Sequence, residues 1–384
     1  MEKAKKLLYI VRYPLFEGFH LKQKFDGQLN AFRQLGYHPS FIGFDKQYFY
    51  LIDDDKKTVV GKTRFWIPNY FHTFVYIDLY KVAMRVVQYN HIDIVYYRSA
   101  PVFRKTYAMA KCLNTNHCKF IVEIPTYTPD VKEIDLSLPR KVFKSYSNVW
   151  SKKTETLPDL YVFMGDGNLT FFHGVPAIRI ENGIDPELMP TRESVNEQDT
   201  IHVLALSSMC YWHGYDRLIK SLADYRGAQS IIIHIVGNDD GGCLAQWKEL
   251  VHKNNLGNNV VFHGPLFGED LNAIFNLCDI GVNSMGMYRK GFEDTSELKT
   301  REYISRGLPF VSSVYDVVLD GLDKDLWYQI SNDDTIPSME GIVQFGLKVK
   351  ADNTAKDRLH EYAVRTMTWK AQYEKVFARL EGEK

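Results

Sequence analysis

Two carboxylates lie eight positions apart in the stretch DTSELKTREYISRGLPFV, which spans residues 294–311. They are Asp294 and Glu302, and an ionised carboxylate accepts hydroxyl hydrogen bonds that are stronger than neutral ones. The same stretch predicts a short helix that starts after the cap residues 294–296 and ends at Gly307. The amides of its first turn would attract an anion. This stretch therefore combines groups that bind hydroxyls with groups that bind anions, although Glu302 is also placed for an ordinary helix ion pair with Lys299.

Length and composition define the class of protein around this stretch. The chain has 384 residues, no net formal charge and 45% hydrophobic residues, which predicts a folded protein of two domains. A neutral balance argues against nucleic acid as a partner. No apolar run reaches the length of a membrane span, and Arg12 interrupts the apolar N-terminal stretch, which we interpret as a first strand and not as a signal peptide. The five cysteines are scattered without zinc or redox spacing, which favours a reducing, cytoplasmic compartment.

Apolar runs rich in β-branched residues alternate with amphipathic segments along the whole chain. The runs that predict strands are 7–13, 40–44, 92–98, 119–125, 160–165 and 177–183, then 201–208, 230–237, 259–264, 279–284 and 309–314. This alternation predicts an α/β protein made of two Rossmann-like, doubly wound domains that face each other across a cleft. The polar, proline-containing stretch 185–200 is interpreted as the linker between them. We place the first domain at 1–183, with a returning helix at about 366–384, and the second at 184–365.

Several segments of the second half, taken in order, resemble the nucleotide-sugar domain of a retaining, family-four GT-B glycosyltransferase. They are ENGID (181–185), IVGNDDGG (235–242), the run 258–284, EYISRGLPFVSS (302–313) and TWKAQYEKVF (368–377). The resemblance covers residues 160–384 well and residues 1–159 loosely. A dehydrogenase is disfavoured because no Gly-x-Gly-x-x-Gly follows the first strand.

The resemblance implies roles for the acidic residues of the opening stretch. Glu302 matches the glutamate that holds the ribose of the donor, and Asp294 stands where the family has the glutamate that holds the transferred sugar. Glu293 is an alternative to Asp294. Further donor-binding positions implied by the resemblance or by neighbouring strand ends are Ser208, His213, Gly237, Phe262, Gly264, Thr295, Ser296 and Leu298.

A departing diphosphate needs positive charge, because stabilising charge as it develops lowers the barrier. The family usually supplies an arginine and a lysine after the first strand of the second domain, where this chain has Ser208 and His213. We expect Arg289, Lys290 and Lys299 to provide the missing charge, with a solvated loop as the alternative for the first two. No Asp-x-Asp metal motif is evident beside a candidate donor loop, so we expect a mechanism without metal or other cofactor, and the acidic runs 52–55 and 238–240 are interpreted as turns.

The first domain is expected to hold the acceptor. Candidate acceptor residues are Gly18, His20, Lys22, Arg98, Glu123 and Tyr127. His20, Lys22, Arg98 and Glu123 each have a surface or structural alternative. The segment 140–153 interleaves basic residues with Phe143, Tyr146 and Trp150 at helical spacing. Such a helix either docks on an anionic bilayer or packs its aromatic face on its own domain.

Together these features predict a metal-independent hexosyltransferase that moves a sugar from a nucleotide diphosphate, UDP being the expected carrier, to a glycan or lipid-linked acceptor. The expected setting is bacterial surface polysaccharide synthesis, in the cytoplasm or at the inner face of the cell membrane. Two alternatives remain open, a sugar-nucleotide epimerase of the same fold and a noncatalytic GT-B-like binding subunit.

Overall fold

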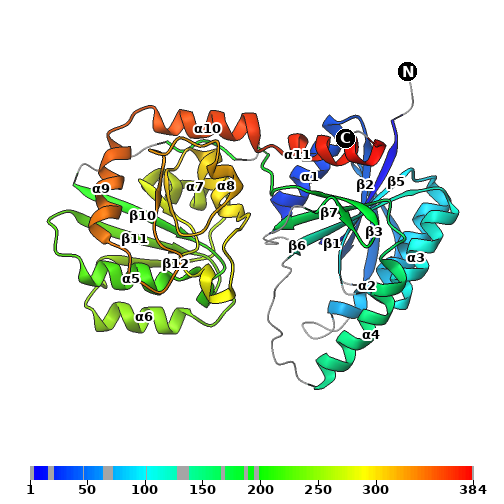
Figure 1. Ribbon diagram of the computed structural model, residues 1–384, viewed down its shortest axis with the longest axis horizontal. Coiled ribbons are helices and arrows are strands. Elements are labelled where there is room, and N and C mark those ends of the chain that lie inside the picture. Colours follow the sequence, from blue (N-terminus) through cyan, green and yellow to red (C-terminus); the bar gives the residue numbers. More distant parts are fainter. Residues whose placement is uncertain are drawn as a thin grey trace. The chain divides into compact units, whose positions relative to one another are not determined.

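The chain forms two compact units in a computed structural model that describes residues 4–15, 21–45, 47–63, 72–100, 102–127, 138–165, 169–185, 189–193 and 199–382. Unit 1 comprises Met1–Glu181 and Trp369–Lys384, and unit 2 comprises Asn182–Thr368. The division lies within a few residues of the predicted positions 183 and 366. The units are described separately below, and most of their elements are labelled in Figure 1.

Unit 1 is built on one sheet whose strand order is β4-β3-β2-β1-β5-β6-β7-β9-β8. Its strands are β1 (Lys6–Pro14), β2 (His38–Asp45), β3 (Tyr48–Asp53), β4 (Lys56–Lys62), β5 (Ile94–Arg98), β6 (Lys119–Tyr127), β7 (Leu160–Gly165), β8 (Phe171–Phe172) and β9 (Val175–Arg179). The central strands pair in parallel, whereas β3 and β4 extend one edge as an antiparallel hairpin. That hairpin is not among the predicted strands, and the acidic run 52–55 contains its turn.

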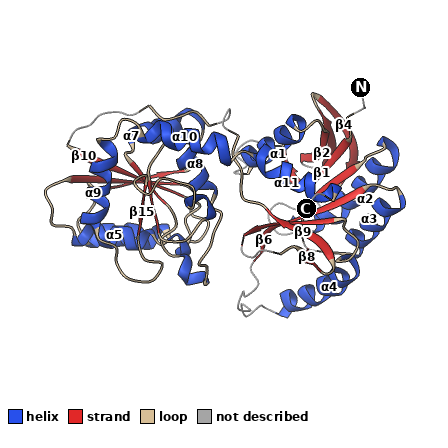
Figure 2. Ribbon diagram, turned by 45° about the horizontal axis from the view of Figure 1, so that its top comes forward, coloured by secondary structure: helices blue, strands red, loops and turns tan. Residues whose placement is uncertain are grey.

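Helices cover both faces of this sheet, as a doubly wound fold requires (Figure 2). They are α1 (Lys22–Gln34), α2 (His72–Asn90), α3 (Arg104–Thr115), α4 (Leu138–Thr154) and α11 (Trp369–Glu381). On one face, α1 and α11 bury an aromatic core in which Phe32 and Tyr373 contact each other and Tyr96. On the other face, α2 and α3 pack on Leu8, Val95 and Phe120. The helix α11 therefore completes unit 1, although it lies at the other end of the chain.

Unit 2 is built on a fully parallel sheet of strand order β12-β11-β10-β13-β14-β15. Its strands are β10 (Thr200–Leu206), β11 (Ser230–Val236), β12 (Val260–Gly264), β13 (Ile280–Val282), β14 (Phe310–Ser312) and β15 (Trp327–Gln329). The run of isoleucines in β11 suits a strand with helices on both faces. The strand order reverses between β10 and β13, which makes their carboxyl ends the switch point where ligands bind in such sheets.

The helices of unit 2 also lie on both faces of its sheet (Figure 1). They are α5 (Tyr215–Asp224), α6 (Leu244–Lys253), α7 (Gly268–Leu277), α8 (Leu298–Arg306), α9 (Met339–Lys350) and α10 (Ala355–Thr366). One core joins α5, α6 and α9 to one face of the sheet, and another joins α7, α8 and α10 to the opposite face. In the part of the chain that the structure describes, no helix combines the length and apolar character that a bilayer crossing needs.

The interpretation of residues 185–200 as an interdomain linker is wrong for their described part, which is built into unit 2. The backbone N–H of Arg192 donates to the carbonyl of Arg306 at 2.9 Å, and its buried guanidinium binds the carbonyls of Gly307 and Cys278. Gly307 and Cys278 are the C-cap residues of α8 and α7. Arg192 therefore donates hydrogen bonds to carbonyls that have no partner within their own helix. The chain passes between the units at residues 181–182 and 368–369 instead.

A row of three histidines crosses the parallel strands β10, β11 and β12. His202 Nδ1 lies 2.9 Å from His234 Nε2, and His234 Nδ1 lies 2.9 Å from His263 Nε2. The neighbouring rings are stacked with centroids 5.2 Å apart. His202 and His234 are buried, so the shared hydrogen bonds satisfy polar atoms inside the sheet's packing.

Candidate functional site

The candidate donor site lies in the loops that follow β10, β11 and β13 at the switch point of unit 2. Backbone hydrogen bonds hold the first two loops together beyond their strands. Ser207 N–H donates to the carbonyl of Val236 at 3.0 Å, and Met209 N–H donates to the carbonyl of Asn238 at 2.6 Å. The carboxyl end of β12 joins them, because Gly237 N–H donates to the carbonyl of Gly264, its last residue, at 2.9 Å. The predicted positions Ser208, Gly237 and Gly264 therefore lie in one connected loop cluster.

Two glycines allow the loops to approach each other this closely. Gly237 has φ 138°, and a Cβ there would lie 1.7 Å from the carbonyl oxygen of Ser207. Gly214 has φ 66°, and its Cβ would lie 2.5 Å from the amide nitrogen of Gly286, in the loop after β13. A side chain at either position would push apart two loops of the site.

The helix α8 begins later than predicted, at Leu298, with Glu297 at its N-cap. Residues 294–296, which were predicted to cap the helix, make contacts with other segments of the chain instead. Thr295 N–H donates to the carbonyl of Tyr315 and Asp294 forms a β-bridge with Tyr315, so this segment runs beside the loop after β14. The Ser296 hydroxyl accepts from the backbone N–H of Asn182 at 3.0 Å. The free amides of the first turn therefore belong to residues 298–300.

The charged residues of α8 are buried in ion pairs. Arg301, fully buried, forms a two-point contact with Asp316, and Arg306 Nε donates to Glu302 Oε1 at 2.9 Å. The exposed Lys299–Glu302 pair considered above does not form. Lys299 Nζ lies 3.6 Å from Glu297 Oε1 instead, with only 8% of its side chain exposed. A helix this compact carries these charges because its neighbours supply buried partners for them.

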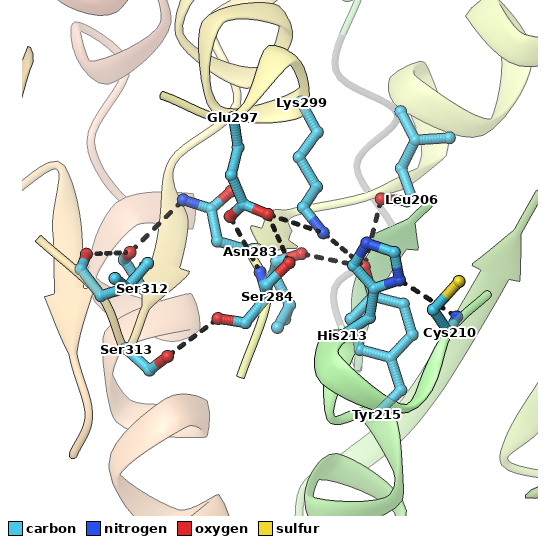
Figure 3. A network of polar contacts seen from close by, with 12 residues as sticks. Leu206, Cys210, His213, Tyr215, Asn283, Ser284, Glu297, Lys299, Ser312 and Ser313 are labelled. Atoms are coloured by element: carbon cyan, nitrogen blue, oxygen red, sulfur yellow. Dashed lines mark hydrogen bonds and ion pairs between the residues drawn. The ribbon is translucent and has the colours of Figure 1, made fainter. Parts of the chain in front are cut away.

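The Lys299–Glu297 pair belongs to a polar network at the carboxyl ends of β10 and β13 (Figure 3). Glu297 accepts from the backbone N–H of Ser284 at 3.2 Å and from the Ser284 hydroxyl. Lys299 Nζ donates to the Tyr215 hydroxyl at 3.2 Å, which in turn donates to the carbonyl of Leu206 at 3.1 Å. These contacts fix the ammonium of Lys299 between the loops that follow the two strands.

His213 stands in this site as a neutral imidazole. Its Nδ1 accepts from the backbone N–H of Cys210 at 3.2 Å. Burial, together with the positive charges of Lys299 and Lys290, lowers the pKa of His213 from 6.5 to about 2. The positive charge at this position therefore comes from the two lysines and not from the histidine.

The two basic residues of the 286–291 loop have different surroundings. Arg289 binds both oxygens of Asp216 at 2.9 Å, and this pairing raises the pKa of its guanidinium. Lys290 is an exposed residue, and its Nζ lies 4.5 Å from the ring centroid of Trp212 and 4.8 Å from that of Phe292. Arg289 thus holds the loop to α5, whereas Lys290 lies beside two aromatic faces near His213.

The remaining predicted donor residues differ in exposure. Ser208, Glu293 and Leu298 are exposed, and Asp294 is half-buried. Thr295 is buried, and its hydroxyl has no hydrogen-bond partner among the described residues. Phe262 lies within β12, with Lys248 Nζ 5.7 Å from its ring centroid, and packs on the core of unit 2.

Of the acceptor candidates, Arg98 and Glu123 are joined in unit 1. Glu123 is fully buried and accepts from Arg98, from the Tyr96 hydroxyl at 2.8 Å and from Gln28 Nε2 at 3.4 Å. The same Gln28 amide donates to the Tyr373 hydroxyl of α11 at 2.6 Å. Its carboxylate is enclosed by partners that hold α1 and α11 to the sheet, which favours a structural role for Glu123, and a direct contact with an acceptor stays a prediction.

The other acceptor candidates are less informative. Lys22 is exposed and pairs with Asp26 at 2.5 Å within α1. Tyr127 ends β6, where it is paired with Gly165. Gly18 and His20 lie outside the described residues.

The aromatic residues of α4 contact α3 and the residue that precedes it. Ring pairs join Phe143 and Tyr146 to Phe103, and Trp150 to Tyr107. Tyr146 remains 44% exposed and the basic residues Lys152 and Lys153 are exposed. These contacts favour the interpretation that α4 packs its aromatic face on unit 1.

Sequence reasoning missed Glu297, Tyr215 and Trp212 as members of the site. Trp212 had a signal, since it directly precedes His213, whereas the roles of the other two depend on contacts between elements distant in sequence. Among the described residues, one group has the composition of a metal site, His38, Asp53 and Asp54 at the turn end of the β3–β4 hairpin. It is largely exposed, and Arg33 lies 3.6 Å from Asp54, so a cation there would meet a competing charge.

Comparison with known proteins places this geometry in a known fold. No family model matches the chain, and no curated protein matches it. Solved structures match over nearly its whole length, among them a glycosyltransferase from Rickettsia africae, at 13% identity, a TM-score of 0.65 and coverage of 99% of this chain and 100% of that one. Sucrose-phosphate synthase from Thermosynechococcus elongatus matches at 13% identity and a TM-score of 0.66, with the same coverage. Anabaena HepE in complex with UDP-glucose matches at 12% identity and a TM-score of 0.58, covering 98% of this chain and 99% of that one.

These likenesses define the class of fold. The chain has the GT-B fold, built from two α/β units as in these solved structures, as its sequence resemblance implied.

Proposed function

We propose that the chain is a glycosyltransferase that takes a sugar from a nucleotide diphosphate donor bound at the switch point of unit 2. One observation carries the proposal. Two lysines place their positive charges close to His213, the position where the resembling family has a lysine. They are Lys299, from α8, and Lys290, from the loop after β13. Two elements thus supply the cationic environment that a departing diphosphate requires, although the expected arginine and lysine are absent from the sequence.

UDP is the proposed carrier, because the matching Anabaena structure holds UDP-glucose. The diphosphate would lie against the first-turn amides of α8 and the two lysines. Glu302 would accept the ribose hydroxyls, and its contact with Arg306 at 2.9 Å holds the carboxylate in a fixed orientation. Asp294, or the exposed Glu293, would contact the transferred hexose, and Arg289 would position the loop through Asp216.

The remainder of the proposal rests on the family resemblance. Transfer would retain the anomeric configuration, with the leaving phosphate assisting the acceptor hydroxyl and no metal ion taking part. Unit 1 would receive a glycan or lipid-linked sugar in bacterial surface polysaccharide synthesis. The exposed lysines of α4 would suit an acceptor held at an anionic membrane surface.

The test is calorimetric titration of UDP, GDP and their sugars, followed by assay of nucleotide release with and without a chelator. Glu302→Ala should weaken UDP binding about tenfold to a hundredfold, because a charge-assisted hydrogen bond contributes about 1.5–3 kcal/mol. Glu249→Ala, an exposed glutamate on α6, is the control and should bind normally. Unchanged binding by the Glu302 variant would remove Glu302 from the site, and activity that is lost with a chelator and restored by a divalent metal would contradict the metal-free mechanism.

One specific observation favours a second candidate, a noncatalytic binding subunit. His213 is neutral, and Glu297 places a negative charge beside Lys299. Such a subunit would show no nucleotide release with any donor, whereas an epimerase would convert a nucleotide sugar to its epimer without an acceptor.

A further inference from the structure

The carboxylate of Glu297 occupies a set of donors of the kind that binds phosphate oxygens. The set comprises the backbone N–H of Ser284 at 3.2 Å, the hydroxyl of Ser284, and the ammonium of Lys299 at 3.6 Å (Figure 3). An amide, a hydroxyl and an ammonium converge on one anion, which is 13% exposed at its side chain. The anion in this structure is supplied by the protein itself.

The ammonium of Lys299 has hydrogen-bonding capacity left over in this arrangement. It has three N–H groups, and its hydrogen bond within the described residues goes to the Tyr215 hydroxyl at 3.2 Å. The distance to Glu297, 3.6 Å, is that of an ion pair and is too long for a good hydrogen bond. Since only 8% of the Lys299 side chain is exposed, water has little access to the remaining N–H groups. A buried ammonium with unused donors indicates a site built for a further acceptor.

The first turn of α8 does not depend on the side chain of Glu297. Glu297 is the N-cap residue of α8, but its side chain makes no cap hydrogen bond to the helix. Its carboxylate can therefore leave Ser284 and Lys299 without breaking the first turn of α8. Leu298, the next residue along the chain, is exposed, so solvent lies close to a displaced carboxylate.

We propose that Ser284 and Lys299 form an anion subsite in which Glu297 is a displaceable internal ligand, and that the diphosphate of the donor competes with Glu297 for it. This inference rests on the proposed function. While Glu297 is in place, it neutralises Lys299 and lowers the affinity of the site for diphosphate. Displacement by the donor frees the lysine charge when the leaving group needs it, which makes Glu297 a determinant of donor affinity and selectivity.

The test is a double-mutant cycle with inorganic pyrophosphate and with UDP as probes, measured by calorimetry. Glu297→Gln should raise pyrophosphate affinity about tenfold or more, because a like charge beside the ligand is removed. Lys299→Met should change affinity little in the wild-type background and lower it about tenfold or more in the Glu297→Gln background. That non-additivity is the signature of a lysine whose charge the glutamate neutralises.

Folding is checked in the same experiment. Glu297→Gln leaves Lys299 without its buried partner and should lower the melting temperature, and pyrophosphate should raise it by more than it does in the wild type. Glu249→Gln is the matched control, a glutamate-to-glutamine change at an exposed site. If Glu297→Gln folds and binds pyrophosphate no better than the wild type, or if the two effects add, the inference is wrong.

The outcomes separate this inference from the proposed function. Turnover of a nucleotide sugar with no change in the Glu297 variant would retain the function and reject the subsite. Tighter pyrophosphate binding by the variant, with no nucleotide bound by any form, would retain the subsite and reject the function.

Discussion

Acid should destabilise the protein through His213, because the imidazole is held neutral in the folded state. Its pKa falls from 6.5 to about 2 on folding, chiefly through burial. Below pH 6.5 the unfolded chain takes up a proton that the folded chain refuses, so stability falls as the pH falls. The pKa of the unfolded imidazole lies about 1.5 units above pH 5, so the unfolded chain is almost fully protonated there. Its proton uptake lowers the free energy of unfolding at pH 5 by about 2 kcal/mol relative to pH 8. Because the side chain is partly accessible to water, this figure is an upper bound.

The assay is urea unfolding of the wild type and of His213→Asn at pH 8 and pH 5. An asparagine oxygen can accept the Cys210 N–H but does not titrate, so the variant should lose up to about 2 kcal/mol less between the two pH values. His252→Asn, an exposed histidine on α6, is the control for removing one imidazole. Equal pH dependence in the wild type and the His213 variant would refute the assignment of a neutral, buried imidazole.

Two further substitutions test the packing that holds the loops and the helix of the donor site in place. Gly237→Ala should disrupt the loops after β10 and β11 and abolish UDP binding, because its Cβ would lie 1.7 Å from the Ser207 carbonyl oxygen. Gly242→Ala is the matched control, since it has φ 69° but open space around its Cβ, and a similar loss in both variants would mean that backbone strain alone is responsible. Asp316→Asn should destabilise unit 2 by about 3–5 kcal/mol in a urea titration, because it leaves the fully buried Arg301 without its charge partner. The exposed Asp357→Asn should be neutral, and an equally small effect at Asp316 would show that Arg301 finds another acceptor.

The alternation of apolar runs was sufficient to predict the parallel strands at the centre of both sheets. The β3–β4 hairpin was missed because β4, KKTVVGK, is largely exposed and polar, so it lacks the buried pattern used to identify strands. Edge strands of this kind derive their order from pairing, which the sequence shows only weakly.

The start of α8 illustrates a different limit. Cap propensity predicted residues 294–296, but the Tyr315 backbone pairs with this segment and Asn182 takes the Ser296 hydroxyl. Tertiary contacts therefore overrode a local signal. Tyr215, which binds Lys299, and the partners of Glu123 likewise come from elements distant in sequence, so burial could not be predicted for Lys299 or Glu123.

The two hydrogen bonds of the histidine row across β10, β11 and β12 share one donor-to-acceptor direction across the sheet of unit 2. A neutral imidazole has one N–H and one bare nitrogen, so His234 must give a proton to one neighbour and receive one from the other. The three tautomers are consequently set together, all pointing from β10 toward β12 or all pointing back. A change of tautomer in one ring alone would place two N–H groups, or two bare nitrogens, head to head between adjacent strands, so the three rings can only change tautomer together.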